Sequence, residues 1–394
     1  MRACGKKREN HLPRCFGLAL CLMLCLLYAC SAVAEMDYTL YNPHLQVQVD
    51  QPATDSFDVL SVESSVQPGM DVSSGYELPA ETLTWPRTFT VTVAGDTTLG
   101  STDDLRKRPD CFENVAESNG YAWFFSGLAP LFGTDDLTLV NFEGTLTEET
   151  AKKQKKFNFR GPAEYTEILT SGSIEAVNVA NNHTLDYGEK GRTDTIANLE
   201  AAGLVVSGNG QLGIFEKNGV KVGMTGYCFP YNNGKKDITS DVKALRAAGC
   251  QIVIASFHWG SEYRDDFTAE QRNIGRAAIR AGADIVVGHH PHIVQGIEKY
   301  QSHYILFSLG NLVFGGNVDP DDRDAYAARL TFTVYEDHTE PPVLTIVPLR
   351  LTALETGTDY RPVLAEGEKA DKIVSRILRR SSEMGDFMNT PFEP

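Results

Sequence analysis

The sequence predicts an α/β fold in which two β-sheets pack face to face and helices cover their outer surfaces. Short apolar runs alternate with helical patterns over most of the chain, which is typical of parallel strands buried on both faces. Two further segments have the pattern of antiparallel pairs. Because parallel and antiparallel pairing occur in the same domain, we expect two sheets rather than one.

Six apolar runs are predicted to form the parallel strands. Each run is nearly continuous in apolar residues, as expected for strands covered on both sides. The predicted strands are Phe89–Ala94, Leu137–Phe142, Ala176–Ala180, Ile252–Phe257, Ile285–Val287 and Tyr304–Leu309.

Two pairs of segments are predicted to be antiparallel. An Asn-Gly pair at 218–219 separates Ile214–Lys217 from Val220–Thr225, and Asn-Gly favours the tight turn of a β-hairpin. Arg329–Tyr335 and Val343–Leu351 form the second predicted pair.

Helical patterns lie between the predicted strands. All four end directly before a glycine, the residue that most often terminates a helix. The predicted helices are Tyr121–Phe132, Gly188–Ala202, Asp241–Ala248 and Thr268–Ala281. Lys369–Arg380 predicts a further, basic helix that we expect to pack late or to stay partly free.

Residues 1–34 are predicted to be a signal peptide or a membrane anchor. A basic stretch ends at Arg14 and an uncharged apolar run, Phe16–Ala34, comes after it. The small residues Ala32–Ala34 suit signal cleavage, the segment before Cys30 resembles a lipoprotein box, and the run is nearly long enough to stay in the membrane. Each alternative exports the rest of the chain, so we expect an extracellular or envelope-attached protein.

The rest of the chain divides by composition into three parts. Residues 35–85 are rich in Ser, Asp, Gln, Thr and Pro and are predicted to be a flexible linker. We expect one domain over residues 86–352, and a C-terminal helix and tail over residues 353–394.

The charge and cysteine content exclude some functions. The 394 residues carry a formal net charge of −16, which repels nucleic acid. Cys111, Cys228 and Cys250 are the only cysteines after residue 34, and this sparse, odd set is not a disulfide framework. Buried thiols are favoured over a catalytic cysteine.

Polar side chains come directly after the predicted strands, at the points where these strands end. In open α/β sheets, ligands bind beyond the carboxyl ends of the strands, so six such ends would converge on one crevice. The strand-end residues are Asp96, Asn141, Glu143, Asn181, Asn182, His183, Asp186, His258, Glu262, His289, His290, His292 and Asn311.

This set predicts a site for one or two divalent metal ions. Carboxylate, amide and imidazole groups together suit Mn, Zn or Fe. His290 and His292 are two residues apart and would lie on one side of an extended segment, and Glu143 is the candidate to bridge two cations. Taken alone, Asp96, Glu143, the Asn181–Asn182 pair and His258 are each more typical of a turn, a cap, a surface charge or a partly buried histidine than of a ligand, and the run from His289 to His292 is about equally typical of both. Their shared placement favours a common polar site.

At these residues the sequence resembles the CapA-like capsule-synthesis (poly-γ-glutamate biosynthesis) family, a branch of the calcineurin-like metallophosphoesterases. Six segments carry the resemblance in family order over about residues 88–315. They are VTVAGDTTLG, LTLVNFEGTLT, NVANNHTLDYGEKG, SFHWGSEY, VVGHHPHIVQG and LFSLGNLVFG. The resemblance implies a four-layer α/β/β/α sandwich.

The resemblance also implies roles for individual residues. Asp96 and His292 would ligate a first metal, and Glu143 would take the bridging place. His183 would contact the substrate or act as the general acid. The ligands of the second metal would be Asn182, His258 and His290.

The sequence departs from the metallophosphoesterase pattern at two positions. Thr98 stands where those enzymes usually carry a His, and Asn141 stands where they carry an Asp. Both changes resemble the CapA-like branch, but they weaken the first metal site and make a single tight metal plausible.

Some residues are predicted to contact the substrate. A guanidinium such as that of Arg160 suits carboxylate or phosphate. The run of lysines at 152–156 is predicted to be a solvated loop rather than a polyanion contact. The candidate substrate-binding residues are Arg160, Asn181, Asp186, Glu262 and Asn311.

Three functions remain open at the level of the sequence. The resemblance favours an exported protein that supports the synthesis, transfer or release of an anionic envelope polymer such as poly-γ-glutamate, with membrane subunits of a polymer-synthesis complex as partners. A general secreted metallophosphoesterase acting on phosphate-containing substrates is the second hypothesis. A scaffold subunit without catalytic activity is the third, and Thr98 is the residue that favours it.

Overall fold

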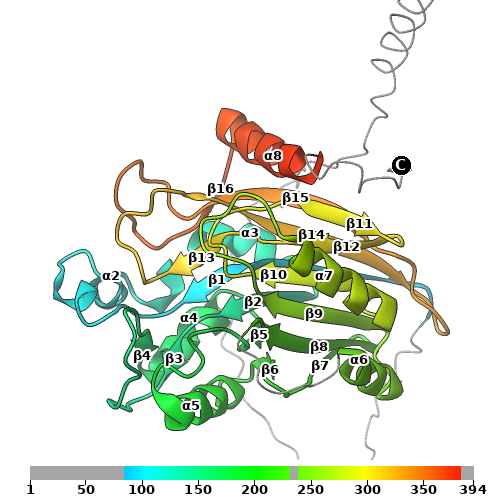
Figure 1. Ribbon diagram of the computed structural model, residues 1–394, viewed down its shortest axis with the longest axis horizontal. Coiled ribbons are helices and arrows are strands. Elements are labelled where there is room, and N and C mark those ends of the chain that lie inside the picture. The colour runs from blue at the N-terminus through cyan, green and yellow to red at the C-terminus, as the bar shows by residue number, and fades with distance from the viewer. Residues whose placement is uncertain (1–83, 231–237, 383–394) are drawn as a thin grey trace, which may run out of the picture. The chain divides into compact units, whose positions relative to one another are not determined.

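Two β-sheets packed face to face form the centre of the computed structural model, which describes residues 84–230 and 238–382 (Figure 1). The predicted leader and nearly all of the predicted linker lie outside the described residues. In the order of their hydrogen bonding, the strands of the first sheet are β16 (Val363–Leu364), β15 (Val343–Arg350), β14 (Asp324–Val334), β1 (Arg87–Thr98), β2 (Leu137–Phe142), β5 (Ala176–Asn178) and β6 (Val205–Ser207), and β13 (Asn311–Phe314) also pairs with β1.

The second sheet has a parallel centre and antiparallel edges. Its strands, in order, are β11 (Ile297–Tyr300), β12 (His303–Leu306), β10 (Ile285–His289), β9 (Ile252–His258), β8 (Val220–Cys228) and β7 (Gly213–Lys217). The predicted hairpin is confirmed, since β7 and β8 pair antiparallel. β14 and β15 form the second predicted antiparallel pair.

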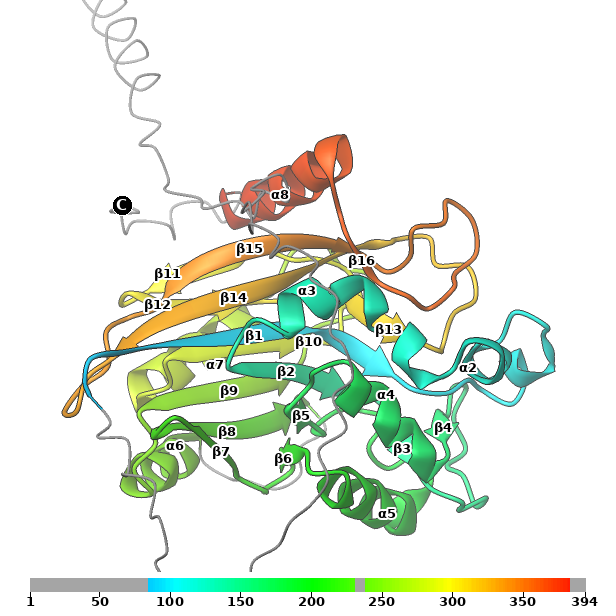
Figure 2. The same ribbon diagram turned by 180° about the vertical axis from the view of Figure 1, so that it is seen from behind.

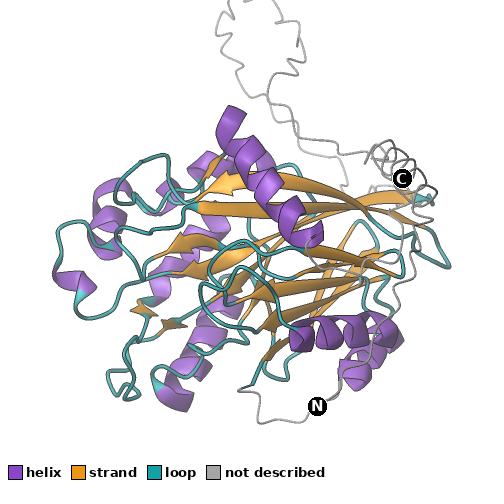
Figure 3. Ribbon diagram, turned by 45° about the horizontal axis from the view of Figure 1, so that its top comes forward, coloured by secondary structure: helices purple, strands orange, loops and turns teal. Residues whose placement is uncertain are grey.

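Helices cover the outer faces of both sheets (Figures 2 and 3). On the first sheet these are α2 (Phe112–Asn119), α3 (Ala129–Phe132), α4 (Thr166–Ser171) and α5 (Gly188–Ala201), and on the second sheet α6 (Ile238–Ala247) and α7 (Ala269–Ala281). A short pair, β3 (Thr145–Leu146) and β4 (Arg160–Gly161), lies beside α5. The predicted sandwich of helix, sheet, sheet and helix layers is confirmed.

Successive side chains of the central strands alternate between the core that lies between the two sheets and the core under the helices. In β9, Ile252 and Ile254 belong to the core between the two sheets, whereas Val253, Ala255 and Phe257 belong to the core under α6 and α7. Successive side chains of a strand point to opposite faces, so a continuous apolar run satisfies both cores.

The predicted helix Tyr121–Phe132 is wrong as a single element. Two short 3₁₀ turns precede the one-turn helix α3. Pro130 has no backbone N–H to continue a helix through this point. A Cβ at Gly127 would lie 2.4 Å from the carbonyl oxygen of Pro362, so the chain here is shaped by close packing.

The C-terminal helix α8 (Gly367–Ser382) is packed and not partly free. Ile373 and Ile377 are completely buried in the core between the sheets. The helix contacts β15 of one sheet and β11 of the other. Within residues 84–230 and 238–382, no helix has the length and hydrophobicity needed to cross a lipid bilayer.

A half-buried carboxyl directly before β5 predicts a pH-dependent stability. Burial raises the pKa of Glu175 to about 7 from its ordinary value of 4.5. The folded state therefore binds a proton more tightly, and this stabilisation is present below pH 4.5 and is lost as the pH rises through 7. We expect Glu175→Gln to flatten the pH dependence in this window and to stabilise the protein at pH 8 by about 1 kcal/mol, allowing for partial solvent screening. Urea unfolding at several pH values measures this, and an unchanged slope would contradict the assignment.

Candidate metal centre

Asp96 sits at the centre of the site because three strands meet around it. β1 pairs with β2 at Asn141 and with β13 at Asn311, both opposite Asp96. A Cβ at Gly95 would lie 2.1 Å from the carbonyl oxygen of Gly310, so only glycine allows this close approach.

The backbone directly after β2 places Glu143 beside β1. Its N–H donates to the carbonyl of Thr97 at 2.8 Å, and the Thr98 hydroxyl donates to its carbonyl, also at 2.8 Å. Thr98 occupies the position where the metallophosphoesterase pattern has a histidine. In this protein its side chain holds the backbone of the central carboxylate.

The second sheet delivers the imidazoles. His258 ends β9, and His289 ends β10 directly opposite it. His290 and His292 come next in the chain, with φ angles of 96° and 60°, a region that L-residues with side chains rarely adopt. Such strain is typical of functional sites. Here it turns both imidazoles toward the first sheet.

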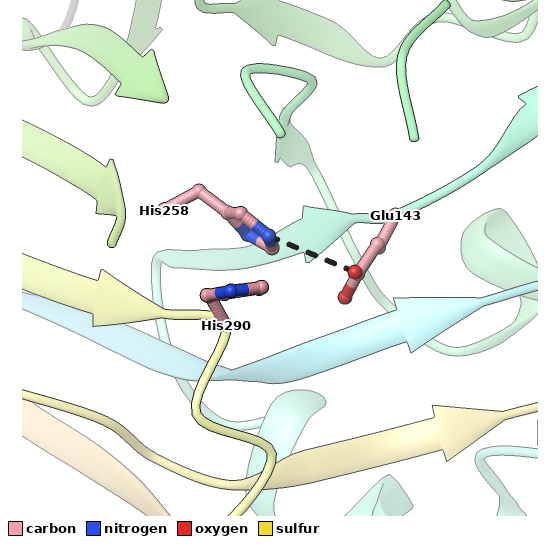
Figure 4. Close-up of side chains that lie close together, drawn as sticks. All are labelled: Glu143, His258 and His290. Atoms are coloured by element: carbon pink, nitrogen blue, oxygen red, sulfur yellow. Dashed lines mark ion pairs between the residues drawn. The ribbon is translucent and has the colours of Figure 1, made fainter. Parts of the chain in front are cut away.

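Glu143 is shared by two groups of candidate ligands. In each of two groups, Glu143–His258–His290 and Asp96–Glu143–His292, one ligand atom from each residue lies within 4.8 Å of the others. Figure 4 shows the first group, in which His258 Nε2 lies 3.7 Å from Glu143 Oε1. His292 Nε2 lies 4.0 Å from the same oxygen. Two atoms that bind the same ion at about 2.1 Å each lie at most about 4.2 Å apart. The distances from Glu143 Oε1 to His258 Nε2 and to His292 Nε2 are therefore each short enough for a cation to bind both atoms of the pair.

Buried atoms without partners also fit a cation. Within the described part of the chain, five buried ligand atoms have no hydrogen-bond partner. They are Glu143 Oε1 and Oε2, Asn182 Oδ1, His258 Nε2 and His290 Nδ1. Buried polar groups without partners are costly, and this oxygen and nitrogen set suits Mn, Zn or Fe. The residues present therefore fit a metal centre.

Burial and neighbouring charges shift the pKa values of the carboxyls and imidazoles of the cluster. Burial raises the pKa of Glu143 to about 8. Burial would also raise the pKa of Asp96, but hydrogen bonds from His289 and His292 hold it well below its ordinary value. Burial and His292 lower the pKa of His290 to about 4. A cation would favour both the ionised carboxylate and the neutral imidazole.

His183, which follows β5 of the first sheet, also faces the Glu143 carboxylate. Its Nε2 lies 3.8 Å from Glu143 Oε1, and its Nδ1 lies 2.8 Å from Asp186 Oδ2. The ring of Phe159 packs against it at 4.5 Å between centroids. Burial lowers the pKa of His183, although Asp186 opposes this. A buried imidazole oriented by a carboxylate is the arrangement used for proton transfer.

The predicted substrate residues fall into two sets in the structure. Asn181, Asp186 and Asn311 hold the cluster: Asn181 Oδ1 accepts from the His183 N–H at 3.0 Å, and Asn311 Oδ1 lies 2.8 Å from His292 Nδ1. Asp186 is fully buried behind His183. Of the five, Glu262 is the one that is exposed beside the imidazoles.

Arg160 contacts a neighbouring loop and not the ligand cluster. Its Nη1 donates to the Glu149 carbonyl at 2.7 Å, and its guanidinium stacks over Tyr187. Among the described residues these contacts organise the loop rather than the metal centre.

Two residues have roles in the structure that the sequence pattern does not predict. Lys155 lies in the predicted solvated loop, but its ammonium forms an ion pair with Asp186 and lies 3.2 Å from His183 Nδ1. His289 has no role in the predicted ligand sets, yet its Nδ1 lies 3.2 Å from Asp96 Oδ1. The position of His289 at a strand end is a sequence feature from which its place in the site could have been predicted. No sequence feature distinguishes Lys155 from the neighbouring lysines.

Aromatic side chains form the rim of the centre. Phe314 packs against His292 with 5.1 Å between ring centroids, and Tyr263 lies at 6.1 Å from the same ring. Tyr263 is 62% exposed and has a φ of 58°. A strained, exposed aromatic residue beside the imidazoles is well placed to contact a substrate.

Comparisons with known proteins show which proteins this chain resembles. The chain is 32% identical to the PGA biosynthesis protein CapA of Bacillus subtilis over 51% of this chain and 59% of that protein. It is 26% identical to the capsule biosynthesis protein CapA of Bacillus anthracis over 71% of this chain and 74% of that protein. The crystal structure of the calcineurin-like phosphoesterase YfkN from Bacillus subtilis covers 75% of this chain and 98% of its own, with 14% identity and a TM-score of 0.43.

Residues 90–316 match the family described as bacterial capsule synthesis protein PGA_cap. This segment is more than half of the chain and contains both ligand groups that share Glu143. The protein therefore belongs to the bacterial capsule synthesis protein family PGA_cap.

Proposed function

We propose that this chain is an exported CapA-like protein that supports the synthesis, transfer or release of an anionic envelope polymer of the poly-γ-glutamate type. The names of its Bacillus relatives, PGA and capsule biosynthesis proteins, support the polymer. The basic and apolar segment within residues 1–34 supports export. Membrane subunits of a polymer-synthesis complex are the partners that we propose.

The observation that carries the chemistry is the sharing of Glu143 between two ligand groups. Asp96, Glu143 and His292 would hold one divalent ion, and His258 and His290 would hold a second with Glu143 between them. Asn182 Oδ1 is buried without a described partner and completes the second set. When bound, the metal supplies Lewis-acid polarisation and a nucleophilic water at neutral pH.

The residues of the chain itself would position a proton at the edge of this centre. His183 Nε2 faces Glu143. In the protonated imidazole, whose Nδ1–H donates to Asp186, Nε2–H would protonate the oxygen or nitrogen of the leaving group as the bond to phosphorus or carbon breaks, which leaves a neutral imidazole. Asp186 and Lys155 fix the imidazole from behind. Phe159 covers its face and excludes water from it.

A general metallophosphoesterase is the second candidate, and the His183–Asp186 pair favours it. Hydrolysis of chromogenic phosphate esters by the purified protein with Mn²⁺ or Zn²⁺ distinguishes this activity. Turnover of simple esters at rates typical of enzymes, about 1–10³ per second, would favour the phosphoesterase. Slow or absent ester turnover by a metal-loaded protein would favour a polymer substrate.

Deletion and complementation in the host test the leading proposal. We expect deletion to abolish cell-surface polymer, the native gene to restore it, and a gene encoding Glu143→Gln to fail. Restoration by Glu143→Gln at equal protein levels would show that the chain acts as a scaffold. Unchanged polymer after deletion would refute the role in polymer production.

A further inference from the structure

A charged cavity of about 510 Å³ lies between α8, the start of β14 and the end of β15. Its lining consists entirely of charged side chains, four acidic and five basic. The basic residues are Arg323, Arg350, Lys372, Arg376 and Arg379. On a chain with 52 acidic and 36 basic residues, this local excess of cations reverses the overall sign.

Helix α8 holds three of the cations in one stripe. Lys372, Arg376 and Arg379 are separated by four and three residues, a spacing that places side chains on the same helix face. Ile373 and Ile377 anchor the helix in the core, so the stripe is held in place over the sheet.

Most of the acidic side chains in the cavity already form ion pairs with basic side chains of the protein. Arg376 Nη1 donates to both Asp322 and Asp324 at 2.9 Å. Glu355 is engaged by Lys369, and Arg350 lies farther from it, at 3.7 Å.

Most of the cations also have acidic partners, since Arg323 pairs with Asp319 and both Arg350 and Arg376 pair with acids of the cavity. Across residues 84–230 and 238–382, Lys372 takes part in no ion pair. Arg350 Nε and Arg323 Nε are buried and have no hydrogen-bond partner. Buried donors of this kind are stabilised when they bind an oxyanion.

We infer that this cavity binds an anion that carries several carboxylates, such as a short run of glutamate residues. The guanidinium fork matches carboxylate geometry, and an all-charged lining excludes apolar ligands, which need largely apolar pockets. The choice of carboxylate over phosphate rests on the proposed function, whereas the anion site itself does not.

The cavity lies outside the segment that matches the family. All of its lining residues come after residue 316, where the match ends.

Fluorescence anisotropy of a labelled γ-linked glutamate decamer, titrated with the full-length protein at low salt, tests this site. EDTA is present throughout, so that binding through a metal does not contribute. We expect saturable binding that Lys372→Glu weakens roughly tenfold, equivalent to about 1.4 kcal/mol, and that the milder Lys372→Gln weakens roughly threefold. Lys243→Glu on α6 makes the same charge change at another exposed position and should leave the affinity within twofold.

Four results would overturn the assignment. Absence of binding, or equal affinity of the native and Lys372→Glu proteins, removes the site. Equal losses in Lys372→Glu and Lys243→Glu would mean that only overall charge matters. Displacement of the decamer by inorganic pyrophosphate at lower concentration than by unlabelled decamer would assign the cavity to phosphate instead. None of these results bears on metal binding at Glu143, so the proposed function stands or fails separately.

Discussion

Adding Mn²⁺ or Zn²⁺ to metal-free protein is expected to raise its unfolding temperature by on the order of 10 °C. A ligand that binds only the folded state stabilises it by about 4 kcal/mol at a thousandfold excess over its dissociation constant, and each kcal/mol corresponds to about 2–4 °C for a domain of 150–250 residues. The stabilisation arises because the cation supplies partners for Glu143, His258 and His290, whose buried atoms have none among the described residues. Differential scanning fluorimetry with EDTA and with each metal measures it.

Glu143→Gln should affect the stability of the metal-free protein and of the metal-bound protein differently. Without metal at pH 8 we expect this variant to be at least as stable as the native protein, because a neutral amide replaces a carboxyl whose pKa burial raises to about 8. With metal it should lose most of the stabilisation, since the shared ligand has lost its charge. Glu175→Gln removes a half-buried carboxyl away from the centre and should keep the full metal effect. A metal response in Glu143→Gln equal to that of the native protein would rule out this centre.

His183→Ala is expected to lower the turnover of a metal-loaded protein by about 10²–10⁴-fold, the usual range for a general acid. The reason is that His183 Nε2 is the nitrogen on this side chain that faces Glu143, while Nδ1 is held by Asp186. Metal content should stay unchanged, because neither ligand group includes His183. Steady-state kinetics on the best substrate of the ester screen, with metal analysis of each variant, measures both quantities.

His338→Ala provides the control for the histidine variant. His338 is exposed and contacts Asp337 and Tyr335, so its loss should leave turnover within twofold. Asp186→Asn should lower turnover less than His183→Ala does, because it misorients the imidazole without removing it. Full activity in His183→Ala would exclude this residue as the proton donor, and a parallel loss of metal would make it a ligand instead.

The strands and the cluster of candidate ligands could be predicted from the sequence because both depend on local rules. Continuous apolar runs predict buried strands, and Ile252–Phe257 became β9 with residues on two cores. Parallel strands of one sheet end at the same edge, so polar residues after each run had to gather there. Asp96 lies in β1 of the first sheet and His292 follows β10 of the second, so their closeness also requires these edges of the two sheets to meet. The observed distance between Asp96 Oδ2 and His292 Nδ1 is 3.3 Å.

Other features depended on contacts between segments that are distant in the sequence. Lys155 belongs to a loop whose pattern is that of any solvated lysine run, and only the fold of the chain around Asp186 brings it to His183. Asp186 and Asn311 looked like substrate contacts, but burial behind His183 and His292 makes them supports for those imidazoles. The predicted helix at 121–132 failed for the same reason, because close packing against Pro362 overrides local preference.

The amino-acid pattern alone therefore settles which strands form and which strand ends carry the ligands, since side-chain alternation and strand direction are properties of neighbouring residues. Tertiary packing decides which polar groups face a common centre and which support it, because side-chain direction in loops is set by distant partners. The charged cavity is the clearest case. Lys372, Arg350 and Asp321 come from a helix, a strand and a loop, and only the docking of α8 on the sheets brings their charges together.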